Sequence, residues 1–145
     1  MARYFVGWGD LDANNHFSNT AILNRAADAR LAYFAEHGFS GARFAAERLG
    51  PVMVWDVLEY RKELRLLEAY TVELQLEGLS EDGVRFALRN VFKNEAGEVT
   101  ATVLSEGVWF DLTTRKPRAP PPDLEAIQRG IPTAEAYRVL PSRRA

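Results

Sequence analysis

The chain has 145 residues, and its 18 Lys and Arg against 20 Asp and Glu give a formal net charge of −2. This length predicts one domain, residues 1–145, with a single core, while 47% hydrophobic and 26% charged residues exclude a disordered chain. Without cysteine there is no disulfide, thiolate site or cysteine nucleophile, and with two histidines we expect no metal site.

The first residues lack the apolar core of a signal peptide, since Asp10 comes too early. No apolar run approaches the roughly 18 residues that a membrane span needs. We therefore expect a soluble cytoplasmic protein that does not bind membranes.

The first forty residues predict a strand, a loop and a helix. Residues 3–8 are rich in aromatic and β-branched side chains, which favour a strand, and the polar residues 9–18 predict a loop. Residues 19–37 predict the one long helix, with Ser18 or Asn19 as its N-cap and a glycine at its end. One helix face carries Ile22, Ala26, Ala29 and Tyr33. Its alanines let a neighbouring backbone come close, so we expect a sheet to wrap this helix.

From residue 52 onward, strand patterns dominate. Long strands are predicted over residues 52–64, 70–79, 84–92 and 99–112. The turns between the last three are short enough for an antiparallel meander. One strand, one helix and four antiparallel strands predict an α+β fold in which the helix packs on one sheet. The other sheet face is then solvated or covers another subunit.

The C-terminal segment differs in charge and proline content. Residues 114–145 carry seven basic and three acidic side chains, and six of the seven prolines follow residue 116. We expect a Pro-rich basic tail of loop and short helix packed on the domain. We favour a solvated surface that offsets the acidic body over a contact for an anionic ligand. No nucleic-acid binding is expected, because the basic residues are scattered and the body repels phosphate.

Candidate functional residues gather in the loop before the long helix. Residues 10–19 contain two carboxylates, Asp10 and Asp12, one imidazole, His16, and several amide and hydroxyl side chains. A helix N-terminus presents unpaired N–H groups and partial positive charge, which suit an oxyanion formed during acyl transfer. A carboxylate beside it can act as nucleophile or general base. On spacing alone, however, helix capping explains these residues better than catalysis.

This loop and the segments after it resemble a known family. Gly9-Asp10-Leu11-Asp12, followed by His16, Asn19, Leu23 and Ala29-Arg30, is similar to the signature of the hotdog-fold acyl-CoA thioesterases of the 4-hydroxybenzoyl-CoA thioesterase type. The similarity continues through residues 50–52, 60–64, 97–101 and 110–117. It covers about residues 4–128, nearly the whole chain.

The resemblance implies a hotdog fold, one long central helix wrapped by a five-stranded antiparallel sheet, paired as a homodimer or homotetramer with active sites between subunits. It implies hydrolysis of an acyl-CoA to free acid and CoA without a cofactor. Asp12 would attack the thioester carbonyl or activate water, and backbone N–H groups near Ser18 and Asn19 would hold the oxyanion. Asp10 and His16 would support the loop.

Substrate contacts follow less directly from the sequence. Arg61, Lys62 and Arg89 are candidates for binding the phosphates of CoA, although solvated, ion-paired strand faces explain them equally well. A carrier-protein substrate is disfavoured by the acidic body. The candidates for the acyl pocket are Phe17, Ile22, Trp55 and Tyr60.

Four residues depart from the family pattern: Asn15, Ser18, Ile22 and Ala27. Asn15 replaces a glycine and tolerates left-handed backbone angles. Ile22 and Ala27 replace a tyrosine and an acidic residue, which makes the pocket more apolar and favours an alkyl acyl chain. The same losses leave a second hypothesis open, a catalytically weak hotdog protein that binds acyl-CoA or serves as an interaction module. A hotdog hydratase is a third, although it pairs its acid and histidine differently.

Overall fold

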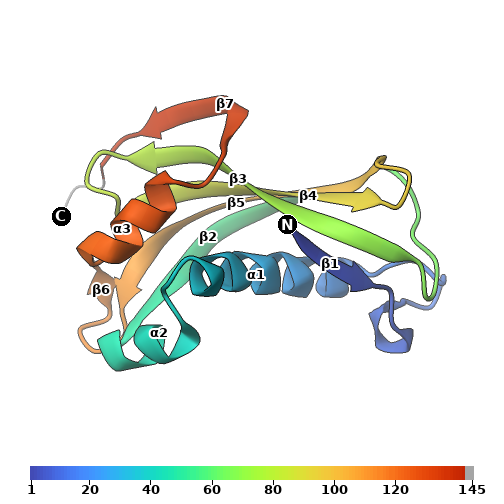
Figure 1. Ribbon diagram of the computed structural model, residues 1–145, viewed down its shortest axis with the longest axis horizontal. Coiled ribbons are helices and arrows are strands. Elements are labelled where there is room, and N and C mark those ends of the chain that lie inside the picture. The colour runs from blue at the N-terminus through green and yellow to red at the C-terminus, as the bar shows by residue number, and fades with distance from the viewer. Residues whose placement is uncertain (143–145) are drawn as a thin grey trace.

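A computed structural model describes residues 1–142 as a long helix lying under a curved sheet (Figure 1). Arg143 and Arg144, two of the basic residues of the expected tail, lie outside the described residues. The helices are α1 (Asn19–Glu36), α2 (Gly41–Glu47) and α3 (Pro122–Arg129), with a 3-10 turn at Trp8–Asp10. The strands are β1 (Ala2–Phe5), β2 (Leu49–Tyr60), β3 (Ala69–Ser80), β4 (Arg85–Asn94), β5 (Val99–Asp111), β6 (Lys116–Pro117) and β7 (Thr133–Leu140).

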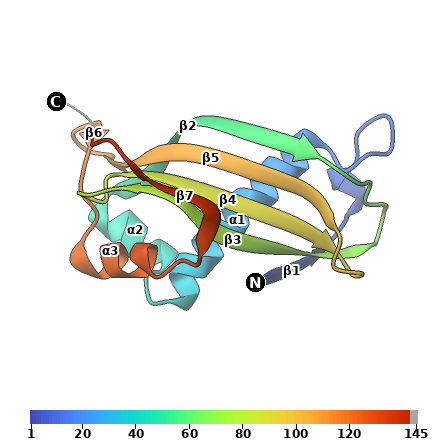
Figure 2. The ribbon, with the colours of Figure 1, turned by 90° about the horizontal axis from the view of Figure 1, so that it is seen from above.

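The sheet has the order β1-β3-β4-β5-β2, and every pairing along this path is antiparallel. Seen from above, β2 forms one long edge, and α1 crosses beneath the strands (Figure 2). The predicted α+β hotdog arrangement is therefore confirmed. The C-terminal segment, expected to be loop and short helix, also adds two strands to the sheet. β6 pairs with β5, and β7 pairs with β3 in parallel.

The boundaries of several elements differ from those predicted. β1 ends at Phe5 because the chain then enters the 3-10 turn. β2 ends at Tyr60, four residues early, since the next two N–H groups, of Arg61 and Lys62, both donate to the Thr100 carbonyl and turn the chain away. Helix α2 was not predicted, because seven residues capped by Ser40 give only a weak periodic signal.

Small residues bring α1 close to the sheet, as the sequence predicted. Ala26 and Ala29 are buried, and Ile22 is 2% exposed. The Ser18 side chain caps the helix by accepting the N–H of Ala21 at 3.2 Å. The helix stops where Gly38 adopts a φ of +107°, which favours glycine. A second apolar cluster fills the other end of the molecule under α2 and α3, around Phe34, Phe39, Phe44, Phe86 and Trp109.

A buried polar network lies between the two apolar clusters. The Arg30 guanidinium donates from Nε to Asn90 Oδ1 at 2.8 Å and from Nη2 to Ser105 Oγ at 2.6 Å. The Ser105 hydroxyl in turn donates to Asp56 on β2. Burial lowers the pKa of Arg30 to about 10, an effect that Asp56 opposes, so the group stays charged at neutral pH. The network fixes α1 to β4 and β5, and through Asp56 to the edge strand β2.

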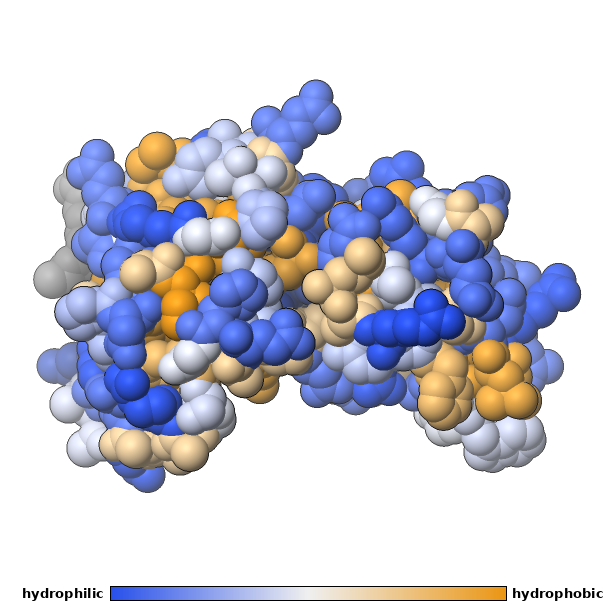
Figure 3. All heavy atoms as spheres, viewed as in Figure 1, coloured by the Kyte–Doolittle hydropathy of each residue, from blue (hydrophilic) through white to orange (hydrophobic). Residues whose placement is uncertain are grey.

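Apolar side chains are also exposed in two places. Along β2, Val54 is 65% exposed and Val57 is 49% exposed. At the opposite end from α2, the space-filling view shows apolar atoms near β1 and the loop before β3 (Figure 3, lower right), where Phe5 and Leu67 are exposed. None of the helices in residues 1–142 has the length and apolar character required to cross a membrane.

The close contact between α1 and the sheet predicts a specific sensitivity to side-chain size. Ala26→Leu should lower the free energy of unfolding by about 1–3 kcal/mol, because the added carbons overfill a packed interface. Ala27→Leu is the matched control, since Ala27 is exposed on the same helix and should change stability by less than about 0.5 kcal/mol. Denaturant unfolding of both variants measures the difference, and equal effects would contradict the packing.

Candidate functional site

Asp12 organises the loop that leads into α1. Its carboxylate Oδ1 accepts the backbone N–H groups of Asn14 at 2.8 Å and His16 at 2.9 Å. Its carbonyl accepts the N–H of Asn15, which has the left-handed φ of +60° expected at the position of the family glycine. The hydrogen bond from the His16 N–H, supported by that from Asn14 and opposed by desolvation, lowers the pKa of Asp12. The carboxylate is therefore ionised at neutral pH.

Asp10 makes the contacts of a residue that fixes the loop. Its Oδ2 accepts the N–H of Gly7 at 2.8 Å, and its Oδ1 lies 3.3 Å from Nη2 of Arg25 on α1. The side chain is 17% exposed. Arg25 also donates to the hydroxyl of Tyr70 and pairs with Asp28. Asp10 thus connects the loop to the first turns of α1. It does not line the pocket described below.

The start of α1 offers one of the two expected backbone donors. The Ser18 N–H donates to the Asp10 carbonyl at 2.8 Å, so it is not available to a ligand, contrary to expectation. The reason is the bridge between Leu11 and Phe17, which closes the loop on itself and uses this group. The Asn19 N–H has no hydrogen-bond acceptor within residues 1–142. As the first residue of α1 it carries an N–H that the helix itself leaves unsatisfied.

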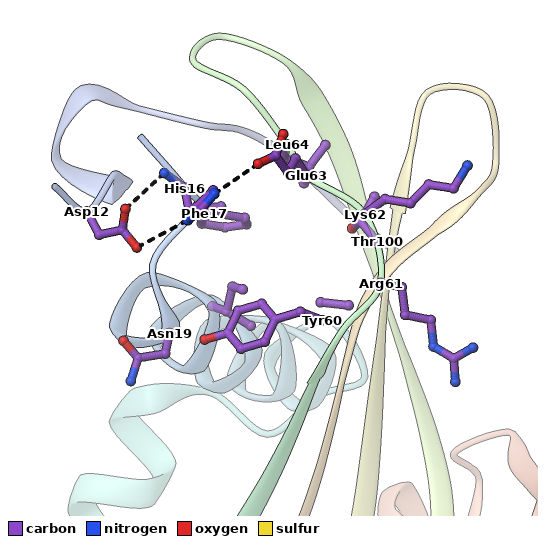
Figure 4. A pocket seen from close by; sticks show the side chains of 12 residues that line it. Asp12, His16, Phe17, Asn19, Tyr60, Arg61, Lys62, Glu63, Leu64 and Thr100 are labelled. Atoms are coloured by element: carbon purple, nitrogen blue, oxygen red, sulfur yellow. Dashed lines mark hydrogen bonds and ion pairs between the residues drawn. The ribbon is translucent and has the colours of Figure 1, made fainter. Parts of the chain in front are cut away.

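A pocket of about 350 Å³ opens between this loop, the start of α1 and the end of β2 (Figure 4). Its lining consists of Asp12, His16, Phe17, Asn19, Ile22, Tyr60, Arg61, Lys62, Glu63, Leu64, Thr100 and Ala101. Residues that are far apart in the sequence meet here, since the loop faces the connection between β2 and β3. The pocket contains five of the predicted site residues: Asp12, His16, Asn19, Arg61 and Lys62.

His16 joins the two sides of the pocket. Its Nε2 lies 2.9 Å from Oε1 of Glu63, and its Nδ1 lies 3.9 Å from Oδ2 of Asp12. Figure 4 shows the imidazole between the two carboxylates. The His16 side chain is half exposed, so a ligand can reach it.

Glu63 was not predicted as a site residue, because it fell within the predicted strand 52–64. It lies instead just after the end of β2, where the chain has turned toward the loop. One signal was present, since residues 60–64 belong to the segments that resemble the family. The sequence did not reveal that this segment faces His16, a contact between residues 47 positions apart.

The apolar part of the pocket agrees with most of the predicted acyl-contact residues. Phe17, Ile22 and Tyr60 line it, together with Leu64 and Ala101. Trp55 does not. Its neighbour Asp56 faces α1 through Ser105 and Arg30, and adjacent residues of a strand point to opposite faces. Trp55 therefore lies on the sheet face away from α1.

The predicted cations occupy different places. Arg61 and Lys62 line the pocket, but their side chains point away from Asp12 (Figure 4). Lys62 pairs with Glu98, and Arg61 lies 3.9 Å from Glu59. Arg89 does not line the pocket. It pairs with Glu77 at 2.7 Å on the face opposite α1, because its neighbour Asn90 faces the helix.

The sequence and fold match known proteins. Residues 6–128 match the Thioesterase-like superfamily. A Staphylococcus aureus protein solved in complex with CoA is 20% identical, with a TM-score of 0.79 over 91% of this chain and 85% of that chain. A gentisyl-coenzyme A thioesterase is 18% identical, with a TM-score of 0.77 over 90% and 100%. A 1,4-dihydroxy-2-naphthoyl-CoA thioesterase from Synechocystis is 14% identical, with a TM-score of 0.77 over 88% and 93%. At these identities the structures share the fold with this chain.

The contacts of Asp10 predict its effect on stability. Asp10→Ala should lower the free energy of unfolding by about 1–3 kcal/mol, because it leaves the Gly7 N–H and one side of Arg25 without a partner. Asp28→Ala removes the other, exposed partner of Arg25 and should cost less than about 1 kcal/mol. Thermal unfolding of the two variants tests this order. A larger loss in Asp28→Ala would contradict the assignment of Asp10 to the loop.

Proposed function

The chain belongs to the thioesterase-like superfamily, and we propose that it hydrolyses an acyl-CoA thioester to a carboxylic acid and free CoA, with Asp12 as nucleophile or general base. One observation carries this proposal. An ionised carboxylate held by two backbone N–H groups lines the same pocket as Asn19, at the N-terminus of α1. The pocket therefore combines a carboxylate, which can attack the thioester carbonyl or activate water, with a helix end that stabilises negative charge.

Two alternative routes use the same groups and give the same products. Asp12 either adds to the thioester carbonyl and forms an anhydride that water then opens, or it removes a proton from the attacking water. In both routes the carbon–sulfur bond breaks, CoA leaves as the thiolate, and water supplies the new oxygen of the acid. The Asn19 N–H stabilises the tetrahedral oxyanion. A contact of this type typically lowers the activation free energy by about 3–4 kcal/mol.

Glu63 and His16 support the geometry of this step. With Glu63 2.9 Å from Nε2, the imidazole is fixed in orientation. The backbone of His16 meanwhile holds Asp12. We infer that Glu63 is a positioning residue, which acts on Asp12 through His16.

The acyl group that best fits the pocket is apolar. Ile22, Leu64 and Ala101 provide aliphatic contacts, and Phe17 adds an aromatic one. The aromatic acyl groups named for the similar structures carry hydroxyls that need polar partners. We therefore favour an alkyl acyl chain.

We also propose that the protein acts as a homodimer joined along β2. The side of this twelve-residue strand away from β5 pairs with no other strand in residues 1–142. An exposed apolar edge strand is a template for pairing, and here it carries five exposed large hydrophobic side chains: Val52, Val54, Trp55, Val57 and Tyr60. The pocket opens beside the end of this edge, at Tyr60.

A panel of acyl-CoA substrates with saturated chains tests the activity. The wild-type protein should release CoA thiol from some of them, and Asp12→Asn should lower kcat by about 1000-fold or more with an unchanged fold. Glu63→Gln should give a smaller loss, mainly in kcat, with an altered pH profile. Asp28→Asn is the matched control and should retain activity. Absence of turnover on every chain length, with acyl-CoA still bound, would favour the binding protein instead.

The edge strand predicts the oligomeric state. Val54→Lys should shift the protein from dimer to monomer in sedimentation velocity at micromolar concentration, because it puts a charge into the exposed apolar stretch of the pairing strand. Val139→Lys is the control, since Val139 is equally exposed, on β7. A wild-type monomer with full activity would overturn the proposal.

A further inference from the structure

We propose that the hydroxyl of Tyr60 is the second hydrogen-bond donor to the oxyanion, opposite the backbone N–H of Asn19. This inference rests on the proposed function, because it adds a catalytic residue to the same hydrolysis. The Tyr60 hydroxyl contacts the reacting carbonyl directly, whereas Glu63 acts through His16.

The loop before α1 leaves the oxyanion with a single main-chain donor. The Ser18 N–H, which was the other expected donor, already donates to the Asp10 carbonyl at 2.8 Å. Enzymes of acyl transfer commonly share the charge of a tetrahedral intermediate between two donors, and side-chain hydroxyls serve in this role as backbone N–H groups do. A second donor must therefore come from a side chain that lines the pocket.

Most polar side chains of the pocket are engaged elsewhere. The Nε2 atom of His16 lies 2.9 Å from Glu63. The buried hydroxyl of Thr100 donates to a carbonyl of β4 at 3.3 Å. The side chains of Arg61 and Lys62 point away from the loop (Figure 4).

Strand register places the Tyr60 ring at the pocket. Tyr60 and Asp56 are four residues apart on β2 and face the same side of the sheet, and Asp56 reaches Arg30 of α1 through Ser105. The residue opposite Tyr60 on β5 is Ala101, whose methyl group leaves room for the ring. Because the chain turns away directly after Tyr60, the ring borders an open space and the residue is 61% exposed.

The Tyr60 hydroxyl is directed toward the start of α1. Figure 4 shows the ring extending from the end of β2 across the pocket toward Asn19, whose own amide group points the other way. The hydroxyl and the Asn19 N–H thus border the same space as Asp12. Within residues 1–142 the Tyr60 hydroxyl has no hydrogen-bond partner, whereas the hydroxyls of Tyr33 and Tyr70 are both bonded within the chain.

The hydroxyl acts without changing its own covalent state. It donates a hydrogen bond to the thioester carbonyl oxygen, and its proton stays on Tyr60 Oη while the carbon–sulfur bond breaks. The hydrogen bond strengthens as the carbonyl oxygen becomes negative, so it stabilises the transition state more than the bound substrate. Its contribution therefore belongs to kcat and not to KM.

The first experiment removes the hydroxyl and keeps the ring. Tyr60→Phe should lower kcat for an acyl-CoA by about 100-fold, with KM, the unfolding midpoint and the sedimentation coefficient unchanged. Tyr137→Phe is the matched control, since it removes a hydroxyl from an exposed tyrosine of β7, and it should retain the wild-type kcat. An unchanged kcat in Tyr60→Phe, or a loss confined to KM, would overturn the inference and leave the proposed function standing.

The second experiment tests the contact with the oxyanion by calorimetry with two analogues of the acyl-CoA that cannot be hydrolysed. A trifluoromethyl ketone becomes tetrahedral at its carbonyl carbon and keeps the oxygen that Tyr60 contacts, whereas a thioether lacks this oxygen. Tyr60→Phe should weaken binding of the ketone by about the same factor as kcat and leave binding of the thioether unchanged.

The two analogues also separate this inference from the proposed function. If the wild-type protein hydrolyses no acyl-CoA, the proposed function fails, and the analogues still test Tyr60. An equal preference for the ketone over the thioether in the wild type and in Tyr60→Phe would overturn the inference.

Discussion

The close contact between α1 and the concave face of the sheet is the constraint on which the rest of the molecule depends. Alanines at the interface allow the backbones to approach, and the buried Arg30 joins the helix to Asn90 and Ser105 at the midpoint of that contact. A buried guanidinium needs its partners in place, so this network fixes the position of α1 along the sheet as well as its distance from it. The N-terminus of α1 is thereby held beside the end of β2 and the start of β5, where the pocket forms.

In the loop before α1, most of the polar groups are hydrogen-bonded within the loop itself. Asp10 takes the Gly7 N–H, and its carbonyl takes the Ser18 N–H. Asp12 takes two further N–H groups and keeps one oxygen near His16. The Asn19 N–H has no acceptor within residues 1–142. The hydrogen bonds that close the loop therefore leave one Asp12 oxygen and the Asn19 N–H available to a ligand.

The edge strand connects fold, assembly and substrate binding. β2 is paired on one side, exposes apolar side chains, and ends at the pocket. In our proposal a second copy pairs with this edge, so that the pocket of each subunit opens beside the joint between the two strands.

Residue patterns alone predicted β1, α1 and the strands β2 to β5 in their order, the capped helix with its small face, and the loop that carries Asp12, His16 and Asn19, because these depend on local periodicity, capping and turn chemistry. They did not predict α2 or β7. The family resemblance is borne out by the match over residues 6–128. The folded chain was needed to show that Glu63 faces His16, that the Ser18 N–H is already bonded, and that Trp55 and Arg89 point away from the pocket. These outcomes depend on strand register and on how the chain leaves β2. A shift of one residue reverses the face of every side chain in a strand, and contacts between distant segments set that register.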